Sequence, residues 1–403
     1  MDKKFAKIVG SDEPKVALIC DWLTEIGGAE QVLEQVSRIF PKAPIFTSQF
    51  RENSSPKYFA SRDIQTGWLN IFPRKLRKFI SPLRYLYFSH LDLREFDLII
   101  SINNAEAKNI SRKNMAPNSI HISYMQGPPT QYYWGLYDRY IENPGFGKLN
   151  FLARIGLKIL VKPLRKVDYN AAQKPDFLLA NSQYVAEEIN KFYDRKSEIL
   201  FPPVGVKAIK DFAKKVDKKE VDQLRKKLFA GAGFYLIAGR QVNWKRMDIA
   251  IDFAKKTKKN LLLIGDGAEH AALVEQAGKC KNIKFLPRYD GARDLTKYLL
   301  AAKGFLFTSL EPFGITPVES LSAGTPVIAF REGGSRDFVN EINGEFFARQ
   351  DAKSLAEAIA KFEDRIFAKN EIIKSAEKFS NENFAKNLVK ILNSKTPKVF
   401  HEK

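Results

Sequence analysis

The sequence predicts an α/β protein made of two domains, each a doubly wound parallel sheet. Its 403 residues exceed what one ordinary hydrophobic core organises. Short apolar strands alternate with helical patterns, most regularly in the second half. A Pro- and Gly-containing segment, ILFPPVGVKAIKDF, separates the two halves and is typical of a hinge.

The first half begins with a buried strand over 15–20, after which Gly27 and Gly28 open a helix with an apolar period. Three more strands are expected over 96–101, 119–125 and 176–182. The second half is expected to contain strands over 233–239, 260–265, 282–287, 304–309 and 326–330, each followed by a helical pattern. We place the domains at 1–203 and 204–379. A C-terminal helix and tail over 380–403, with Ser380 as the N-cap, could pack back on either domain, the N-terminal one included.

Composition places the chain among soluble globular proteins, with 44% apolar and 28% charged residues. No apolar run is long enough to cross a bilayer, and the N-terminus lacks the apolar stretch of a signal peptide. Cys20 and Cys280 are the only cysteines and lie far apart in sequence, which argues against a disulfide framework. We therefore expect a cytoplasmic protein.

The net charge of +20 favours an anionic partner. Two windows, 71–91 and 151–167, each contain five Lys or Arg and no acidic residue. In the second window Arg154, Lys158 and Lys162 form a basic stripe beside an apolar face, which suits a membrane interface but equally a helix packed on its own domain. Nucleic-acid binding is a weaker interpretation because no nucleic-acid-binding motif accompanies the charge.

Candidate binding residues follow the strands of the second half, where open parallel sheets bind ligands. Gly239 permits a tight turn, Arg240 leaves the strand end, and Lys245 and Arg246 are expected to start the next helix; this is an anion site or, failing that, a solvated loop. Around Asp266, glycines allow a ligand or another loop to approach. The segment 284–290 with Arg288 is a turn or a nucleotide-base contact.

The segment LEPFGITPVES, 310–320, contains two glutamates. Pro317 and Gly324 predict a short helix with Glu319 in its first turn, where a carboxylate interacts well with the helix dipole. That arrangement leaves Glu311 unexplained. It also leaves unexplained the backbone N–H groups of Gly314, Ile315 and Thr316.

The segments GRQVNWKRMDIAI, LLLIGDGAEHAAL, NIKFLPRYD, FTSLEPFGITPVESLSAGTPVIAFREGGSRDFV and NGEFF occur in order at compatible spacings. Together they resemble the donor-binding half of retaining glycosyltransferase family 4. ICDWLTEIGGAEQVLEQV and FLLANSQYVAEEINKFY resemble its N-terminal half, and ISYMQGPPTQYYWGLYDRY is most similar to mannosyltransferases of polysaccharide and O-antigen assembly. The resemblance implies the GT-B architecture, two facing Rossmann-like domains with a cleft between them.

The resemblance also implies roles for individual residues. Arg240 and Lys245 would grip the donor diphosphate, and Glu311 would approach the transferred sugar. The donor would also contact Glu319, Gly314, Ile315, Thr316, Phe313, Gly27, Gly28, Asp266 and Arg288. The donor would be a nucleotide sugar, with GDP-mannose favoured, and no metal or other cofactor is expected. The acceptor would be a glycan or lipid-linked glycan, reached at the inner face of the cell membrane.

One departure from the family concerns the segment after strand 119–125, where a histidine is usual and this chain has Gln126. A glutamine hydrogen-bonds but cannot become a cation. Tyr132 and Trp134 in the same segment could line a donor-sugar or acceptor site, or only pack the loop, and His121 is expected to be a packed residue. Two alternatives stay open: a sugar-nucleotide epimerase of related fold, and a non-catalytic sugar-nucleotide-binding protein.

Overall fold

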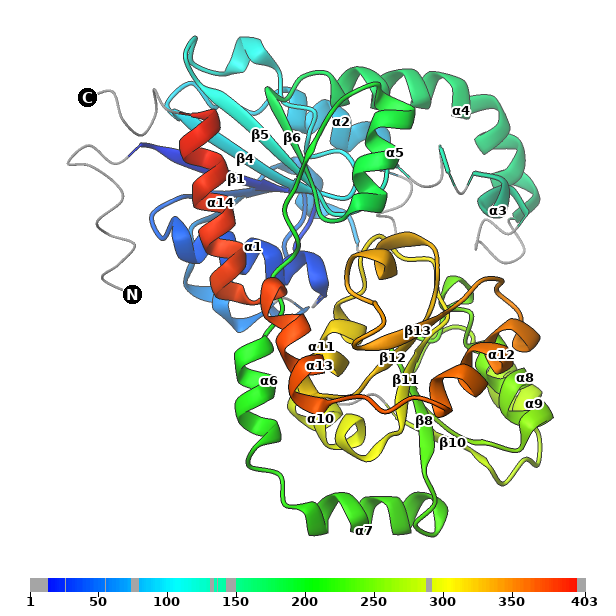
Figure 1. Cartoon of the computed structure of the whole chain (residues 1–403). Coiled ribbons are helices and arrows are strands. Elements are labelled where there is room, and N and C mark those ends of the chain that lie inside the picture. Colours follow the sequence, from blue (N-terminus) through cyan, green and yellow to red (C-terminus); the bar gives the residue numbers. More distant parts are fainter. Residues whose placement is uncertain are drawn as a thin grey trace. The chain divides into compact units, whose positions relative to one another are not determined.

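The protein is described by a computed structural model that covers residues 14–25, 27–54, 56–73, 80–130, 134–135, 137–142, 150–287 and 292–396. The chain divides into two compact units (Figure 1). The first unit contains the residues up to Phe201 and those from Ala385 onward, and the second contains Pro202–Phe384. The division lies beside the predicted hinge at Pro202, Pro203 and Gly205.

The first unit is built on a seven-stranded parallel sheet with the order β3-β2-β1-β4-β5-β6-β7. Its strands are β1 (Val16–Cys20), β2 (Ile45–Thr47), β3 (Ile64–Thr66), β4 (Leu98–Asn103), β5 (Ile120–Met125), β6 (Phe177–Ala180) and β7 (Glu198–Ile199). The four strands predicted for this half are confirmed as β1, β4, β5 and β6. The short strands β2, β3 and β7 were not predicted.

Helices connect these parallel strands: α1 (Gly28–Ile39), α2 (Ser81–Ser89), α3 (Tyr137–Glu142), α4 (Asn150–Ala172) and α5 (Gln183–Tyr193). The predicted apolar period of α1 is its buried face, since Val32, Leu33 and Val36 are each at most 2% exposed. His121 is buried in β5, and its Nε2 lies 2.8 Å from the Ser101 Oγ. Burial lowers the pKa of His121 to about 3, so the expectation of a packed residue is confirmed.

The C-terminal helix α14 (Asn381–Lys395) starts as predicted, because the backbone N–H of Asn383 donates to the Ser380 Oγ at 3.2 Å. Its residues from Ala385 onward belong to the first unit. There Lys395 Nζ pairs with Glu198 Oε1 of β7 at 2.5 Å and lies 5.4 Å from the centre of the Phe177 ring. The C-terminal end of the helix therefore lies beside β6 and β7.

The second unit is built on a six-stranded parallel sheet with the order β10-β9-β8-β11-β12-β13. Its strands are β8 (Phe234–Ala238), β9 (Asn260–Ile264), β10 (Ile283–Leu286), β11 (Gly304–Phe307), β12 (Val327–Phe330) and β13 (Gly344–Phe347). Its helices are α6 (Val206–Ala213), α7 (Lys218–Phe229), α8 (Met247–Thr257), α9 (His270–Ala277), α10 (Ala292–Ala301), α11 (Ile315–Ala323), α12 (Ala352–Glu363) and α13 (Lys369–Ala376). The five strands predicted for this half are confirmed, and β13 is additional.

Both sheets reverse their strand order at one point, between β1 and β4 in the first unit and between β8 and β11 in the second. In such Rossmann-like sheets the helices on the two sides diverge there, which leaves a crevice beyond the carboxyl ends of the two central strands. The segments that follow β1, β4, β8 and β11 are therefore the places to search for a binding site. No helix in the described part of the chain is both long and apolar enough to span a membrane.

Candidate functional site

In the second unit the two strands at the reversal point place a lysine and a glutamate in contact. Lys245 follows β8 and Glu311 follows β11, and Lys245 Nζ lies 2.5 Å from Glu311 Oε1. Ser309 Oγ donates to the same carboxylate oxygen. Both charged side chains keep about a fifth of their surface exposed, 21% for the lysine and 17% for the glutamate. The pair is therefore accessible, and the Glu311 carboxylate is held by both Lys245 and Ser309.

Backbone contacts position this pair. Thr308 Oγ1 donates to the carbonyl of Lys245 at 2.9 Å, so the β8 and β11 segments are joined beside the ion pair. The backbone N–H of Gly334 donates to the carbonyl of Glu311 at 2.9 Å. Neighbouring Gly333 has φ +79, and a Cβ there would meet the Glu311 carbonyl oxygen at 2.6 Å. The glycine pair therefore lets the β12 loop press directly on the glutamate backbone.

A small pocket unites these segments with the start of α11. Lys245, Glu311 and Thr316 all line it. The rest of its wall is formed by Ile237, Ala238, Met247, Phe305, Leu306, Phe307, Thr308, Ser309 and Pro317. The pocket combines polar side chains with apolar residues of β8 and β11, a composition common in small-molecule sites.

The helix α11 is confirmed with Pro317 in its first turn and Gly324 as its C-cap at φ +84. No side chain caps its N-terminus, and the N–H groups of Ile315 and Thr316 have no acceptor among the described residues. Free N–H groups at a helix N-terminus attract anions and hydroxyl oxygens. The predicted donors at this helix start are thus free to bind a ligand.

Glu319 lies in the second turn of α11, so its predicted place in the first turn was wrong and the helix dipole does not account for it. Within the described part of the chain its carboxylate has no hydrogen-bond or ion-pair partner. Burial raises the pKa of Glu319 to about 7. A carboxylate without a partner in an unfavourable position is often held for a ligand.

Arg240 is exposed at the end of β8, and its guanidinium has no partner in the residues the structure describes. Arg246 and Lys245 lie just before α8 rather than in it, since the helix begins at Met247. Arg246 Nη2 pairs with Asp248 Oδ2 at 3.0 Å, so its guanidinium is already occupied by a carboxylate two residues away.

The glycines after β9 accommodate another loop. A Cβ on Gly265 would meet the Gly239 carbonyl oxygen at 2.0 Å, and one on Gly267 would meet the Gln241 carbonyl oxygen at 2.3 Å. Asp266 Oδ1 accepts the N–H of Gly267 at 2.7 Å. Of the two explanations for these glycines, the close approach of a neighbouring loop is the one the geometry supplies.

The Phe313 ring is 2% exposed and packs against Phe338 and Phe379, with ring centroids 5.6 and 5.3 Å away. Any contact of Phe313 with a ligand would therefore be made by its backbone. Tyr132 and Arg288, two further predicted site residues, lie outside the described residues.

In the first unit the reversal point is bridged by Asp21, which follows β1. Its two carboxylate oxygens accept four consecutive backbone N–H groups, those of residues 104–107 after β4, at 2.7 to 3.0 Å. Gly27 is the N-cap of α1 and Gly28 its first residue, as predicted. Gln126 lines a second small pocket here together with Asp21, Ala29, Glu30 and Asn104. Its Nε2 reaches the carbonyl of Ala29 at 3.4 Å.

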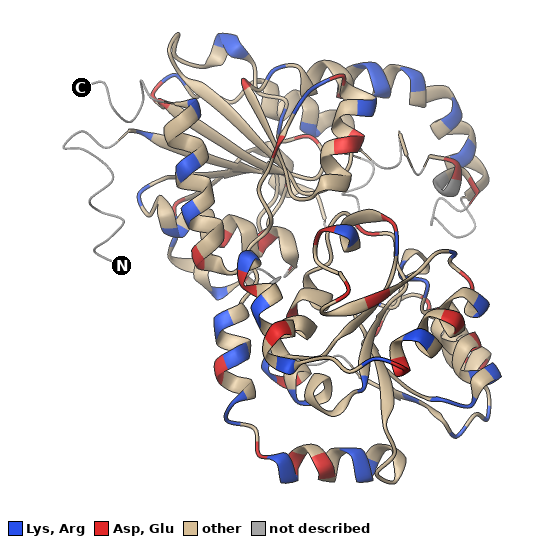
Figure 2. Cartoon of the chain, in the orientation of Figure 1, with Lys and Arg blue, Asp and Glu red and all other residues tan. Residues whose placement is uncertain are grey.

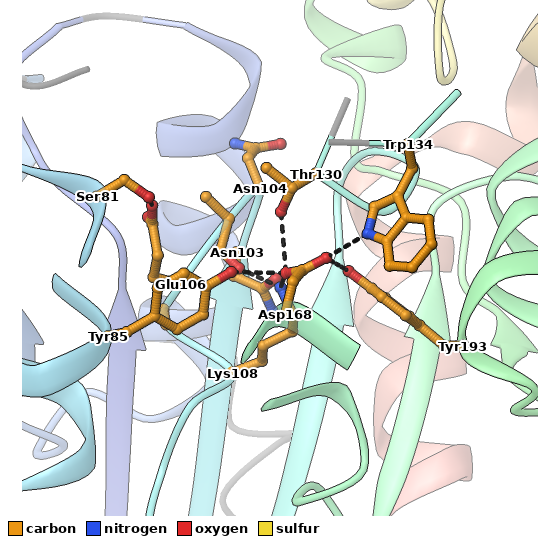
Figure 3. Close-up of polar contacts among 12 residues, drawn as sticks. Ser81, Tyr85, Asn103, Asn104, Glu106, Lys108, Thr130, Trp134, Asp168 and Tyr193 are labelled. Atoms are coloured by element: carbon orange, nitrogen blue, oxygen red, sulfur yellow. Dashed lines mark hydrogen bonds and ion pairs between the residues drawn. The ribbon is translucent and has the colours of Figure 1, made fainter. Parts of the chain in front are cut away.

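A buried polar network lies beneath the segment that follows β5 (Figure 3). Asp168 of α4 is wholly buried, and its carboxylate is bound by Lys108 Nζ at 2.8 Å. Four neutral donors complete its shell: Tyr85, Thr130, Trp134 and Tyr193, at 2.6 to 3.0 Å. Despite the cost of burial, Lys108, Tyr193 and Tyr85 hold the pKa of Asp168 below its usual value.

This network settles the packing of Trp134. Its indole N–H donates to Asp168 at 2.7 Å, and its ring lies 5.3 Å from Phe192. Of the two expectations for this tryptophan, packing of the loop is the one that the contacts support. Beside the network, Arg84 and Glu106 form a second buried pair at 2.8 Å. Arg84 was counted in the basic window 71–91, and its burial removes it from any basic surface.

Sequence patterns did not identify Asp21, Asp168 or Ser309. Asp21 directly follows a predicted strand and Ser309 ends another, so position at a strand end was an available signal for both. Asp168 has no comparable signal, because it lies inside a long helix and its partners come from four separate segments.

Comparison with known proteins agrees with this geometry. Residues 217–382, which include Arg240, Lys245, Glu311 and Glu319, match the family model described as glycosyl transferases group 1. The matched residues make up less than half of the chain and coincide with most of the second unit, Pro202–Phe384.

Over 205 residues the chain is 25% identical to the O-antigen chain mannosyltransferase C of Escherichia coli, covering 49% of this chain and 51% of that protein. The chain thus spans about half the length of the curated relative it matches. Among solved structures, Anabaena HepE in complex with UDP is similar with a TM-score of 0.67 and 18% identity, over 94% of this chain and all of the other. Sucrose-phosphate synthase of Thermosynechococcus elongatus gives 0.64 and 15%, over 97% of this chain and all of the other. The fold is GT-B, as the sequence predicts.

Proposed function

We propose that this protein transfers a hexose from a nucleotide-sugar donor to a glycan or lipid-linked glycan acceptor. The observation that supports it most is the Lys245–Glu311 pair at the strand-order reversal of the second unit, in the residues that match the group 1 glycosyltransferase model. Ligands of doubly wound sheets bind at this position. HepE, whose fold this chain shares, has been solved with UDP and with UDP-glucose.

Charge determines the roles we propose for the cations. When a glycosidic bond to a nucleoside diphosphate breaks, negative charge grows on the leaving diphosphate. Fixed cations stabilise that charge more in the transition state than in the ground state. Arg240 has no partner among the described residues and Lys245 has only one carboxylate, so both could donate hydrogen bonds to phosphate oxygens. With two cations for the diphosphate, the proposal includes no metal or other cofactor.

The two glutamates would hold different parts of the donor. On donor binding Lys245 would exchange the Glu311 carboxylate for the diphosphate, leaving Glu311 free to accept hydroxyl groups of the transferred sugar. Glu319 would accept the ribose hydroxyls, which are the kind of donors that its unpaired carboxylate lacks. The N–H groups of Gly314, Ile315 and Thr316 would bind sugar or phosphate oxygens.

The sugar is the finer part of the proposal. We propose mannose from GDP-mannose, with retention of configuration, on the basis of the sequence resemblance and the O-antigen chain mannosyltransferase relative. Gln126 replaces a histidine that is usual in the resembling family, and it would offer an uncharged amide to the sugar. A lipid-linked acceptor would require the enzyme at a membrane, and we include a cytoplasmic, peripheral location at its inner face.

The direct test replaces Glu311 by Gln, which keeps the size of the side chain but removes its charge. The release of nucleoside diphosphate from GDP-mannose is measured with a lipid-linked glycan fraction as acceptor. We expect the rate to fall by a factor on the order of 100 or more, which is typical for loss of one transition-state contact. The control is Glu357→Gln on the exposed face of α12, which should leave the rate unchanged.

Two results would contradict the proposal. An unchanged rate in Glu311→Gln would exclude this carboxylate from the reaction. Donor binding by the wild type without release of nucleoside diphosphate for any acceptor would indicate a sugar-nucleotide-binding protein instead.

A further inference from the structure

The helix α4 of the first unit has an apolar face that nothing in the described structure covers. Its inner face is packed, with Val161, Asp168, Ala171 and Ala172 buried. Large apolar side chains on the other side are left exposed: Leu152 at 63%, Ile155 at 42%, Ile159 at 69% and Leu160 at 50%. At 100° per residue Leu152, Ile155 and Ile159 lie on the side of the helix opposite the packed residues, and Leu160 lies at the border between the two sides.

Basic residues run along the edge of this apolar face. Arg154, Lys158 and Lys162 follow one another at four-residue intervals, and Lys166 continues the row. All four are exposed, and no carboxylate among the described residues pairs with the three lysines. Asp168 is the only acidic residue of α4, and it is buried. The exposed charge of the helix is therefore entirely positive, as the blue bands along α4 show (Figure 2).

The lysine-rich helix α7 of the second unit provides a comparison within the same chain. Lys218, Lys219, Lys226 and Lys227 lie on it together with Glu220 and Asp222. None of its described side chains is a large exposed apolar one. Solvated surface helices commonly carry both signs of charge in this way. The pattern of α4, apolar and basic without acids, is the one found in helices that lie in a membrane interface.

We infer that α4 is a membrane-binding helix that lies flat on anionic phospholipid, with Leu152, Ile155, Ile159 and Leu160 inserted among the lipid chains. Its 23 residues extend about 34 Å along the membrane plane. Phosphate groups of the lipid would bind Lys158, Lys162 and Lys166 at the edge of the inserted face. The inference names the surface through which the protein would bind the membrane in the proposed function. It rests on that function only for the biological purpose of membrane binding.

The inner face of the same helix explains what membrane contact would do for the reaction. Asp168 binds Thr130 and Trp134, which belong to the segment that begins with Gln126. The lipid-facing helix and the segment that could line an acceptor site are thus joined by a buried network. A lipid-linked acceptor in the bilayer would therefore meet this segment within one unit of the protein.

The test is cosedimentation of the whole chain with vesicles of phosphatidylcholine alone or with about a third phosphatidylglycerol. We expect binding only to the anionic vesicles. Lys158→Gln, Lys162→Gln and Lys166→Gln together should weaken it by a factor on the order of 100, at about fivefold per charge. Ile155→Ser with Ile159→Ser should weaken it about tenfold or more, because inserted apolar surface is lost. The exposed positions of these side chains leave the fold intact, which thermal unfolding checks.

The matched control removes three charges from α7, by Lys219→Gln, Lys226→Gln and Lys227→Gln. An equal loss of binding in this variant would show that only total charge matters and would overturn the inference. Absence of vesicle binding by the wild type would also overturn it. So would binding of duplex DNA with the same affinity as anionic vesicles, if the α4 variants lost both kinds of binding equally. If the wild type did not bind vesicles but formed a concentration-dependent dimer that the Ile155 and Ile159 changes abolished, this face would be assigned to self-association instead. Transfer to a soluble glycan acceptor, assayed in parallel, separates failure of this inference from failure of the proposed function.

Discussion

At the scale of single residues, the carboxylate of Glu319 connects protonation to ligand binding. Its pKa of about 7 exceeds that of a free glutamate, so the folded protein binds this proton more tightly than the unfolded chain. Its contribution to stability is present below the unfolded pKa and is lost as the pH rises through 7. Hydroxyl groups of a ribose would reverse the shift, because they stabilise the charged form.

We therefore predict that nucleotide binding releases a proton from Glu319 at pH 6 to 7, and that affinity rises with pH through this range. Calorimetric titration with GDP in buffers of different ionisation enthalpy measures the release. Glu319→Gln should bind GDP more weakly and release no proton. Binding of GDP by the wild type without proton exchange at pH 6.5 would separate Glu319 from the nucleotide site.

The buried carboxylate of Asp168 provides a second residue-scale prediction, on stability. Removal of one partner of a buried ion pair leaves the other charge uncompensated, which costs about 3–5 kcal/mol. Asp168→Ala should therefore lower the free energy of unfolding of the first unit by about this amount, because Lys108 remains buried. Chemical denaturation followed by Trp fluorescence measures it. The double variant Asp168→Ala, Lys108→Met should regain part of the lost stability. An unchanged free energy of unfolding in Asp168→Ala would mean that the network contributes nothing to stability.

At the scale of elements, the turns that end β8 and β9 depend on glycine. Gly265 has φ +135, and a Cβ there would meet the Gly239 carbonyl oxygen at 2.0 Å. We predict that Gly265→Ala destabilises the second unit by about 2 kcal/mol or more, through backbone strain and overlap. The control is Gly156→Ala in α4, where the Cβ meets nothing within 4 Å. There alanine should stabilise the protein by about 0.5–1 kcal/mol, and thermal unfolding that shows equal effects would contradict the geometry.

The elements also show what the sequence could predict. Continuous apolar runs such as 260–265 predicted nine of the strands, because a strand covered on both faces has no polar alternation. Strands β2, β3 and β7 have only two or three residues, too few to form a pattern. The two-glutamate segment predicted α11 and Pro317 in its first turn, but Glu319 lies in the second turn and not in the predicted first. The Lys245–Glu311 contact was not predictable from local pattern, because it joins residues 66 apart through the sheet topology.

At the scale of the whole molecule, the charge of +20 is unevenly distributed. Arg84 and Lys108 contribute nothing to it, because they are buried and paired with Glu106 and Asp168. The row on α4 is exposed and unopposed, whereas α7 mixes both signs. The distribution of charge is therefore more informative about partners than the net charge. We propose two anionic partners, a nucleoside diphosphate bound by the second unit and a lipid surface bound by the first.

The central claim is that the second unit binds a nucleotide sugar at the Lys245–Glu311 pair. The measurement that tests it most directly is calorimetric titration of the whole chain, without added metal, with GDP, UDP, ADP and dTDP and their common sugar conjugates. We predict saturable binding of one nucleotide family, with GDP-mannose the tightest sugar conjugate. Arg240→Ala and Lys245→Ala should each weaken it about tenfold or more, through loss of a charged phosphate contact, while Lys256→Ala on the exposed end of α8 should not. Binding that is unchanged in both site variants, or absent for every nucleotide, would contradict the account.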